Sequence, residues 1–145
     1  AFNILSHSGP LGPDGFGEGE RRIVAELRRI LDDPGFPISL TAIQAPVFHT
    51  YSMMLYVELE KDASAEALES LFAGLPAFKT TTFREGCGAS SISVSGKDEI
   101  YVGPIKQEPG EGRAFWIWLV ADNLTRGSAL NAFEIARKIL EARSR

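Results

Sequence analysis

The pattern of apolar and polar positions predicts three helices and five strands. Apolar residues recur at helical spacing over 18–31, with acidic residues near the start and a Pro-Gly pair after the end. A second helix is predicted over 64–74, with Asp62 or Ser64 as its cap, and a closing helix over 127–142. Alternating or continuous apolar runs predict the strands, which are 38–45, 51–60, 78–83, 99–106 and 114–121.

The order of these elements predicts an α+β fold. Several strands follow one another without a helix between them, and the Gly- and Pro-rich residues 8–19 predict a loop. The sequence contains no internal repeat, linker or low-complexity tract. We therefore expect one domain over 1–145, with helices on one face of a mixed, largely antiparallel sheet.

Two of the predicted strands, 51–60 and 114–121, are apolar on both faces. Because helices on one side cover only one face, the other face would expose large apolar side chains, as interfaces do. We predict a two-fold homodimer that buries one open face of the sheet. The interface would be either the opposite face or the face that carries Met54, Tyr56, Trp116 and Trp118. The alternative is a small sandwich with both faces covered internally.

Composition narrows the class of protein. With 145 residues, 44% of them hydrophobic, the chain is long enough to form a core. A net charge of −4 and the lack of a basic face argue against nucleic-acid or membrane-surface partners. The single cysteine, Cys87, fits a reducing compartment, and no apolar run has the length of a membrane span. These features predict a cytoplasmic protein.

The candidate chemical residues form no known nucleotide or metal motif. The glycines over 15–20 lack dinucleotide-binding spacing, and the histidines and the cysteine lack metal-ligand spacing, so we predict no metal. We expect Cys87 to be a spectator thiol and His7 a surface residue. His49 is the better acid/base candidate by its chemistry, yet no orienting carboxylate lies near it in sequence.

The segment "ADNLTRGSALNAFEIARKIL" (121–140) begins with capping residues. Asp122, Asn123 and Thr125 are residue types that cap helices, and the small residues at 127–129 would let the backbone approach a flat or charged group. Two interpretations remain at this stage: a tightly packed cap, or a surface that contacts a ligand.

Three segments together resemble a known family: "AFNILSHSG" at the start, "GKDEIYVG" at 96–103 and "ADNLTRGSALNAFEIA" at 121–136. They resemble the C-terminal dimerisation domain of the aspartate-semialdehyde dehydrogenases, oxidoreductases of amino-acid biosynthesis with a glyceraldehyde-3-phosphate-dehydrogenase-like C-terminal fold. The resemblance implies a separate N-terminal dinucleotide-binding domain, absent from this chain, that binds NADP and carries the nucleophilic cysteine. This domain would supply substrate-binding and acid/base groups and the dimer interface.

Position by position, the resemblance implies an altered site. The family's Glu and Lys at the start of the first helix correspond to Gly19 and Arg22. Its substrate-clamping Arg corresponds to Gln44, its acid/base His to Tyr51, and the Arg of its V-G-R-I motif to Pro104. A neutral Gln cannot form a bidentate carboxylate clamp, and a tyrosine is a poor proton shuttle compared with histidine.

The resemblance also implies that cofactor-facing positions are retained, namely Asn123, Gly127, Ser128 and Ala129. We therefore expect a domain that is catalytically degraded or altered, a pseudoenzyme, and inactive in isolation. One alternative is part of an active NADP-dependent oxidoreductase with a changed semialdehyde substrate, in which His49 and Tyr51 take over proton transfer. Another is a ligand-binding or interaction module without catalysis.

Overall fold

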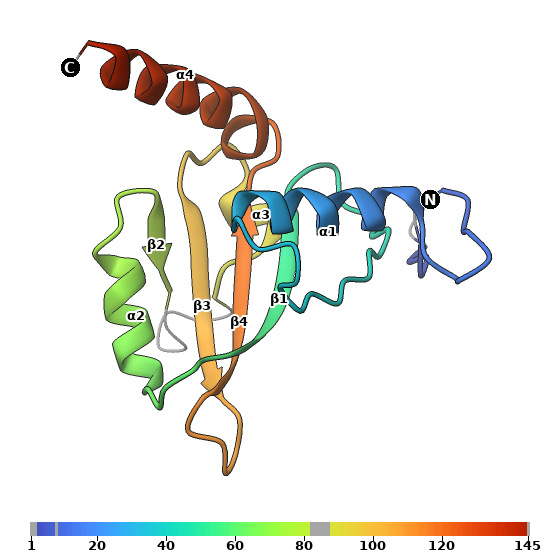
Figure 1. Ribbon diagram of the computed structural model, residues 1–145, viewed down its shortest axis with the longest axis horizontal. Coiled ribbons are helices and arrows are strands. Elements are labelled where there is room, and N and C mark those ends of the chain that lie inside the picture. Colours follow the sequence, from blue (N-terminus) through green and yellow to red (C-terminus); the bar gives the residue numbers. More distant parts are fainter. Residues whose placement is uncertain (1–2, 8, 82–87, 145) are drawn as a thin grey trace. The chain divides into compact units, whose positions relative to one another are not determined.

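The computed structural model describes residues 3–7, 9–81 and 88–144 (Figure 1). The chain divides into two compact units, Ala1–Val47 and Phe48–Arg145. Within the described residues, no helix combines the length and the apolar character that crossing a membrane requires. The predicted spectator thiol of Cys87 lies outside the described residues.

The first unit contains helix α1 (Glu18–Ile30), as predicted. Its N-terminal end is fixed by Glu20, whose Oε2 accepts a hydrogen bond of 2.7 Å from the Gly17 backbone N–H. The other oxygen, Oε1, accepts one of 2.7 Å from the Ala42 N–H. These backbone hydrogen bonds, led by that from Gly17, hold the pKa of Glu20 below its ordinary value. One carboxylate thus caps the helix and anchors the segment around Ala42.

The prediction of a strand over 38–45 is wrong. Leu5 and Gln44 form an isolated antiparallel bridge, with both backbone hydrogen bonds at 2.9 Å, and no longer ladder follows. The reason is local competition, because the Ala42 N–H that a strand would offer to a neighbour is used by Glu20. Alternating polarity alone does not form a strand where no partner strand accepts its hydrogen bonds.

The second unit contains one four-stranded sheet, ordered β1-β4-β3-β2. β1 pairs antiparallel with β4, β4 antiparallel with β3, and β3 parallel with β2. The predicted α+β class and the mixed, largely antiparallel sheet are confirmed, and within the described residues the sheet has no second sheet packed on it as a sandwich would require. The strands are β1 (Tyr51–Glu58), β2 (Phe78–Thr80), β3 (Ile100–Gln107) and β4 (Ala114–Ala121).

The helical segments of this unit differ from the prediction in two places. Ser64 caps the second helix, as one of the two predicted caps, by accepting a 3.2 Å hydrogen bond from the Ala67 N–H. The closing helix starts earlier than residue 127, with a π-helical turn, and a short helix after residue 90 was not predicted. The segments are α2 (Ala65–Ala73), α3 (Ser91–Val94), η2 (Thr125–Ala129) and α4 (Leu130–Arg143).

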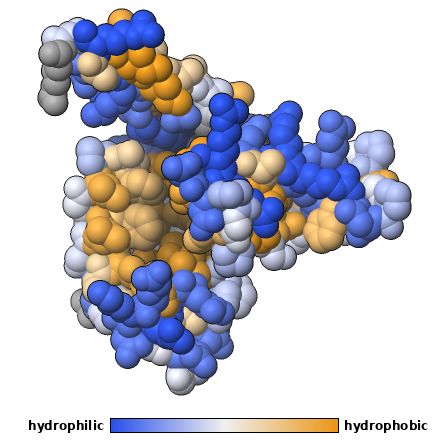
Figure 2. Space-filling view, viewed as in Figure 1, coloured by the Kyte–Doolittle hydropathy of each residue, from blue (hydrophilic) through white to orange (hydrophobic). Residues whose placement is uncertain are grey.

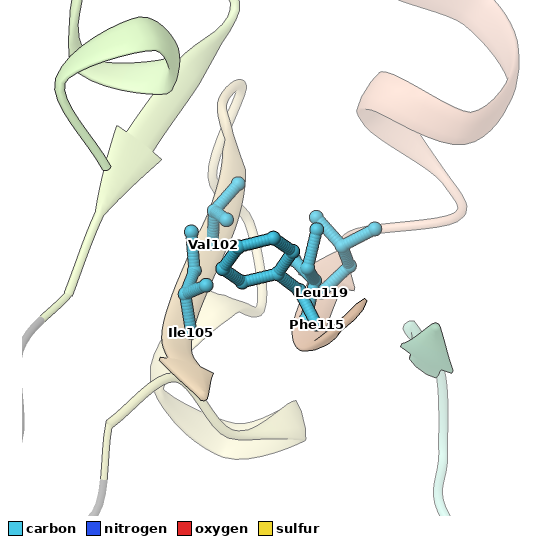
Figure 3. Packing of buried hydrophobic residues seen from close by; sticks show 5 residues of the cluster. Val102, Ile105, Phe115 and Leu119 are labelled. Carbon is cyan, nitrogen blue, oxygen red and sulfur yellow. The ribbon is translucent and has the colours of Figure 1, made fainter. Parts of the chain in front are cut away.

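The core lies on the face of the sheet that α2 covers. Phe115 is fully buried in it, and Figure 3 shows its ring between side chains of β3 and β4. The buried members of this cluster are Val102, Ile105, Phe115, Ile117 and Leu119, and α2 adds Leu68 and Phe72. A smaller cluster, on the opposite face, packs Val94 of α3 against Val120. Helices therefore lie on both faces, and among the described helices only α2 contributes to the main core.

Large apolar side chains remain exposed where β1 pairs with β4. The register confirms the predicted faces, because Tyr56 lies opposite Trp116 and Met54 opposite Trp118. Tyr56 and Trp116 are in contact, with ring centroids 4.9 Å apart, and both are exposed. Trp118 is only half-buried, although its Nε1–H donates to the Ala89 carbonyl at 2.7 Å. In Figure 2, hydrophobic side chains are visible over the part of the sheet formed by β2 and β3.

Replacing Phe115 with Ala should lower the free energy of unfolding by about 3–5 kcal/mol, because it leaves a large cavity in the main core. The matched control is Phe133→Ala on α4, where the ring is 64% exposed and the change should stay within about 0.5 kcal/mol. Urea unfolding followed by circular dichroism measures both. Equal losses would contradict this assignment of the core.

Candidate functional site

The antiparallel pairing of β1 with β4 creates the candidate site. Tyr51, the first residue of β1, lies opposite Ala121, the last residue of β4. The residues before β1 therefore meet the residues after β4, which lead into η2. At one end of this strand pair, the structure thus brings His49 and Tyr51 together with the segment from Asn123 onward, which is predicted to face a cofactor.

A buried carboxylate organises this corner. Asp122 is 1% exposed. Its Oδ2 accepts a 2.6 Å hydrogen bond from the Gly96 N–H, and its Oδ1 accepts bonds of 2.7 Å and 3.1 Å from the Leu124 and Thr125 N–H groups. The hydrogen bond from Gly96 has the largest effect in lowering the pKa of Asp122, and it outweighs burial, which raises that pKa. The side chain is therefore an anion that accepts hydrogen bonds and donates none.

The fold brings next to His49 a carboxylate that is distant from it in sequence. The Nε2 atom of His49 lies 3.5 Å from Asp122 Oδ2 and 2.5 Å from Ser95 Oγ. The imidazole is one-third exposed, at 32%, so the ring has the carboxylate on one side and solvent on another. The pair has the composition of an acid/base residue with an orienting carboxylate.

Thr50, between His49 and Tyr51, is held in an unfavourable conformation. Its φ is 90°, a region that β-branched residues rarely adopt. Its backbone N–H donates a 2.8 Å hydrogen bond to Asn123 Oδ1. The buried Oγ1 of Thr50 has no hydrogen-bond partner within the described part of the chain. Strain and an unsatisfied hydroxyl in one residue mark a site whose surroundings dictate its backbone.

Tyr51 is 59% exposed and lies against η2. A Cβ atom placed on Gly127 would stand 3.6 Å from the ring carbon Cε2 of Tyr51, in ordinary contact. The glycine therefore leaves room beside the phenol ring. Tyr51 is the residue at the position where the resemblance places the family's acid/base histidine.

The predicted cofactor-facing residues lie together in and before η2, and three of them already make local hydrogen bonds. Asn123 Oδ1 binds Thr50, the Gly127 N–H donates 2.9 Å to the Asp122 carbonyl, and Ser128 Oγ donates 2.8 Å to the Leu124 carbonyl. These bonds support the interpretation as a tight cap. Contact of Asn123, Gly127, Ser128 and Ala129 with a cofactor stays a prediction.

Three candidate residues belong to the first unit, which is described by itself. Gly19 lies in the first turn of α1, with open space where a Cβ would be. The Arg22 side chain is 75% exposed and lies 3.5 Å from Glu26 one turn away. Gln44 is exposed, and its backbone pairs with Leu5. Each is positioned by local structure, and the ion pair among these contacts joins Arg22 to Glu26 within α1.

The remaining sequence candidates are His7 and Pro104. His7 is exposed, with Nδ1 3.2 Å from Ser6 Oγ, as expected for a surface histidine. Pro104 lies in a bulge of β3, where the register shifts between Val102 and Ile105. Gly103 is required there, because its φ is 115° and a Cβ would collide with the Thr81 carbonyl. Within 3–7, 9–81 and 88–144, no cluster of three potential metal ligands occurs.

The anchoring role of Asp122 can be tested through pH. Because its pKa is lowered from 3.8 in the folded state, the stabilisation that it gives is present above that value and is lost as pH falls through the folded pKa. Asp122→Asn should therefore flatten the loss of unfolding free energy between about pH 5 and pH 2. Urea unfolding at each pH measures it, with Asp98→Asn, at an exposed carboxylate, as the control. Parallel pH curves for Asp122→Asn and the unmodified chain would refute the role.

Comparison with known proteins identifies the family. Residues 1–126 match the model of the semialdehyde dehydrogenase dimerisation domain. The chain is 30% identical to the aspartate-semialdehyde dehydrogenases of Rickettsia bellii, over 144 residues, and Prochlorococcus marinus, over 141 residues. Each alignment covers 97% of this chain, but only 42% and 41% of those proteins.

Solved structures agree with this match. A probable aspartate-semialdehyde dehydrogenase from Pseudomonas aeruginosa superposes with a TM-score of 0.88 at 28% identity. Aspartate semialdehyde dehydrogenase II from Vibrio cholerae, solved in complex with ASA, has a TM-score of 0.89 at 24% identity and shows the shared fold. Both alignments cover 97% of this chain and 42% of the solved chain, so the chain spans less than half of the relatives that it matches. The chain belongs to the semialdehyde dehydrogenase dimerisation-domain family.

Proposed function

We propose that this chain is the dimerisation and substrate-side domain of an aspartate-semialdehyde-dehydrogenase-like protein whose parent reaction has been lost or changed. The observation that carries the proposal is the identity of the residues at the family's clamp and shuttle positions, Gln44 and Tyr51. The whole protein would pair this domain with a dinucleotide-binding domain that binds NADP. The chain by itself would then be inactive.

The chemistry of the replaced residues supports a lost or changed reaction. An arginine clamps a carboxylate through two charge-assisted hydrogen bonds, which a neutral glutamine cannot form. Gln44 is held by backbone pairing with Leu5, which adds no charge. Histidine as a residue type exchanges protons near neutral pH, and tyrosine is a poorer proton shuttle there. Gly19 removes a third charged group of the family pattern.

The exposed apolar surface of β1 supports the dimer. Met53 and Leu55 point to the face that carries the main core, and Met54 and Tyr56 point to the other face, as their partners on β4 require. All four are exposed, between 38% and 49%. Exposed apolar side chains in this density are typical of surfaces that bind a protein partner. A second copy of the chain is the partner in this proposal.

Two adjacent methionines test which face of β1 forms the dimer. Met53 is 44% exposed on one face and Met54 is 49% exposed on the other. A glutamate buried in the interface would be desolvated without a partner, so either Met53→Glu or Met54→Glu should convert the dimer to a monomer, and the other should not. Sedimentation velocity of the chain at micromolar concentration measures this.

The two variants control for each other, because both add one charge to the same exposed strand. A dimer that survives both substitutions would place the interface away from the sides of β1. An unmodified chain that sediments as a monomer would overturn the proposed dimer itself.

The loss or change of the parent reaction predicts weak turnover of aspartate semialdehyde. With NADP, the full-length protein should act at least about 10²-fold more slowly than the Rickettsia bellii relative, because positioned acid/base catalysis contributes at least that factor. Absorbance of the reduced nicotinamide at steady state measures the rate. Turnover equal to that of the relative would show that the parent reaction is intact despite Gln44 and Tyr51.

A second candidate function has support from the His49–Asp122 pair. A histidine with an orienting carboxylate can transfer protons, and this one lies two residues before Tyr51. The pair favours a function in which this chain is one domain of an active oxidoreductase. That enzyme would use a changed aldehyde substrate, and its other domain would bind NADP. Unlike complete loss of catalysis, this candidate function requires His49 to transfer a proton.

A further inference from the structure

We propose that His49 is a substitute acid/base residue, which Asp122 and Ser95 hold so that its Nδ1 atom exchanges protons with an aldehyde substrate. The inference rests on the proposed function, because it takes this chain to be the substrate-side domain. It goes further by assigning the proton transfer to a position two residues away from Tyr51, and by naming the atom.

The contacts of the ring determine which nitrogen carries the proton. Both neighbours lie at Nε2, with Ser95 Oγ at 2.5 Å and Asp122 Oδ2 at 3.5 Å. Asp122 is an anion that three backbone N–H groups already stabilise, so a bare nitrogen lone pair facing it would be repelled. The hydrogen therefore belongs on Nε2. Nδ1 is left as the acceptor, and within the described residues it makes no hydrogen bond.

The backbone next to His49 is strained. Thr50 has a φ of 90°, and its N–H group donates a hydrogen bond to Asn123 Oδ1. The same residue buries a hydroxyl that has no partner in the described part of the chain. A segment that only joined two elements would relax out of this strain, whereas catalytic and binding sites retain it. The strain lies between the two residues that could act on a substrate.

The phenol ring near His49 is open to solvent. Tyr51 follows by two residues, is 59% exposed, and lies beside Gly127. The Gly127 position has no side chain, and the phenol hydroxyl can donate or accept a hydrogen bond. An aldehyde or its hydrate placed here could contact the phenol while Nδ1 of His49 takes or returns a proton.

The proposed step is a proton transfer. Nδ1 accepts a proton from an O–H or S–H group of the reacting molecules, so that bond breaks while an N–H bond forms. The electron pair stays on the oxygen or sulfur, and the ring becomes an imidazolium ion. Asp122 remains a carboxylate and stabilises the positive ring. Asp122 and Ser95 are positioning residues in this step, and the proton returns from Nδ1 to the product.

The tautomer of His49 tests the geometry without any substrate. The chain has two histidines, and His7 is exposed with Ser6 as its neighbour, so one sample contains its own reference. Long-range ¹H–¹⁵N correlation spectra of the neutral rings should show His49 as a single Nε2–H tautomer and His7 as a mixture. Asp122→Asn should make the neutral His49 ring a mixture of both tautomers. Ser95→Ala, at an exposed residue, is a second variant, which removes the hydroxyl neighbour and keeps the buried carboxylate.

A His49 ring protonated on Nδ1, or a mixture equal to that of His7, would overturn the assignment. A tautomer that neither variant alters would also overturn it, because the two neighbours would then not hold the ring.

Turnover by the full-length protein tests the catalytic role. With NADP and a panel of aspartate semialdehyde, succinate semialdehyde, propanal and butanal, His49→Gln should lower kcat by about 10²-fold or more on whichever aldehyde reacts, with KM nearly unchanged. His7→Gln is the matched control and should leave kcat unchanged. Equal effects of the two variants, or no turnover of any aldehyde, would overturn the role. Sedimentation separates this outcome from failure of the dimer, since the ring assignment does not depend on the oligomeric state.

Discussion

The carboxylate of Asp122 is the contact on which the candidate site depends. It accepts backbone hydrogen bonds from the turn at Gly96 and from the first residues after β4, and it faces His49. An ion without partners would be costly to bury, and the three N–H donors offset that cost. Three segments that are distant in the sequence are thereby fixed around one charge. Their positions follow from the need of the buried Asp122 carboxylate to accept hydrogen bonds.

Most of the fold can be predicted from local sequence patterns. Where the prediction differs from the structure, the cause is local. The period-two pattern of β1 and β4 correctly assigned their faces, since Phe115 and Trp116 do lie on opposite sides. The strand over 38–45 fails because a helix cap, Glu20, takes one of its donors. Helix α3 has four residues, too few for a helical period to be recognised. Competition for a backbone group and short length are not visible in a pattern of hydrophobicity.

The site was predictable as two segments but not as a pair of residues. Asp122 was recognised as a capping type, and it does accept the N–H groups of Leu124 and Thr125. Its second role, beside His49, exists only because Tyr51 pairs with Ala121. If β1 and β4 had been predicted to pair antiparallel, the segment before β1 would have been placed next to the segment after β4. The signal was the register, which a search for nearby carboxylates along the sequence does not use.

The dimer and the proposed proton transfer meet on β1. Its exposed methionines would face a second copy in the proposed dimer, and its first residue, Tyr51, belongs to the candidate site. β1 is an edge strand that pairs only with β4 in the described residues, and an open strand edge offers backbone groups to which another chain can pair. In these proposals a retained dimer surface is compatible with a changed reaction, because the exposed surface runs along β1 whereas His49 precedes the strand.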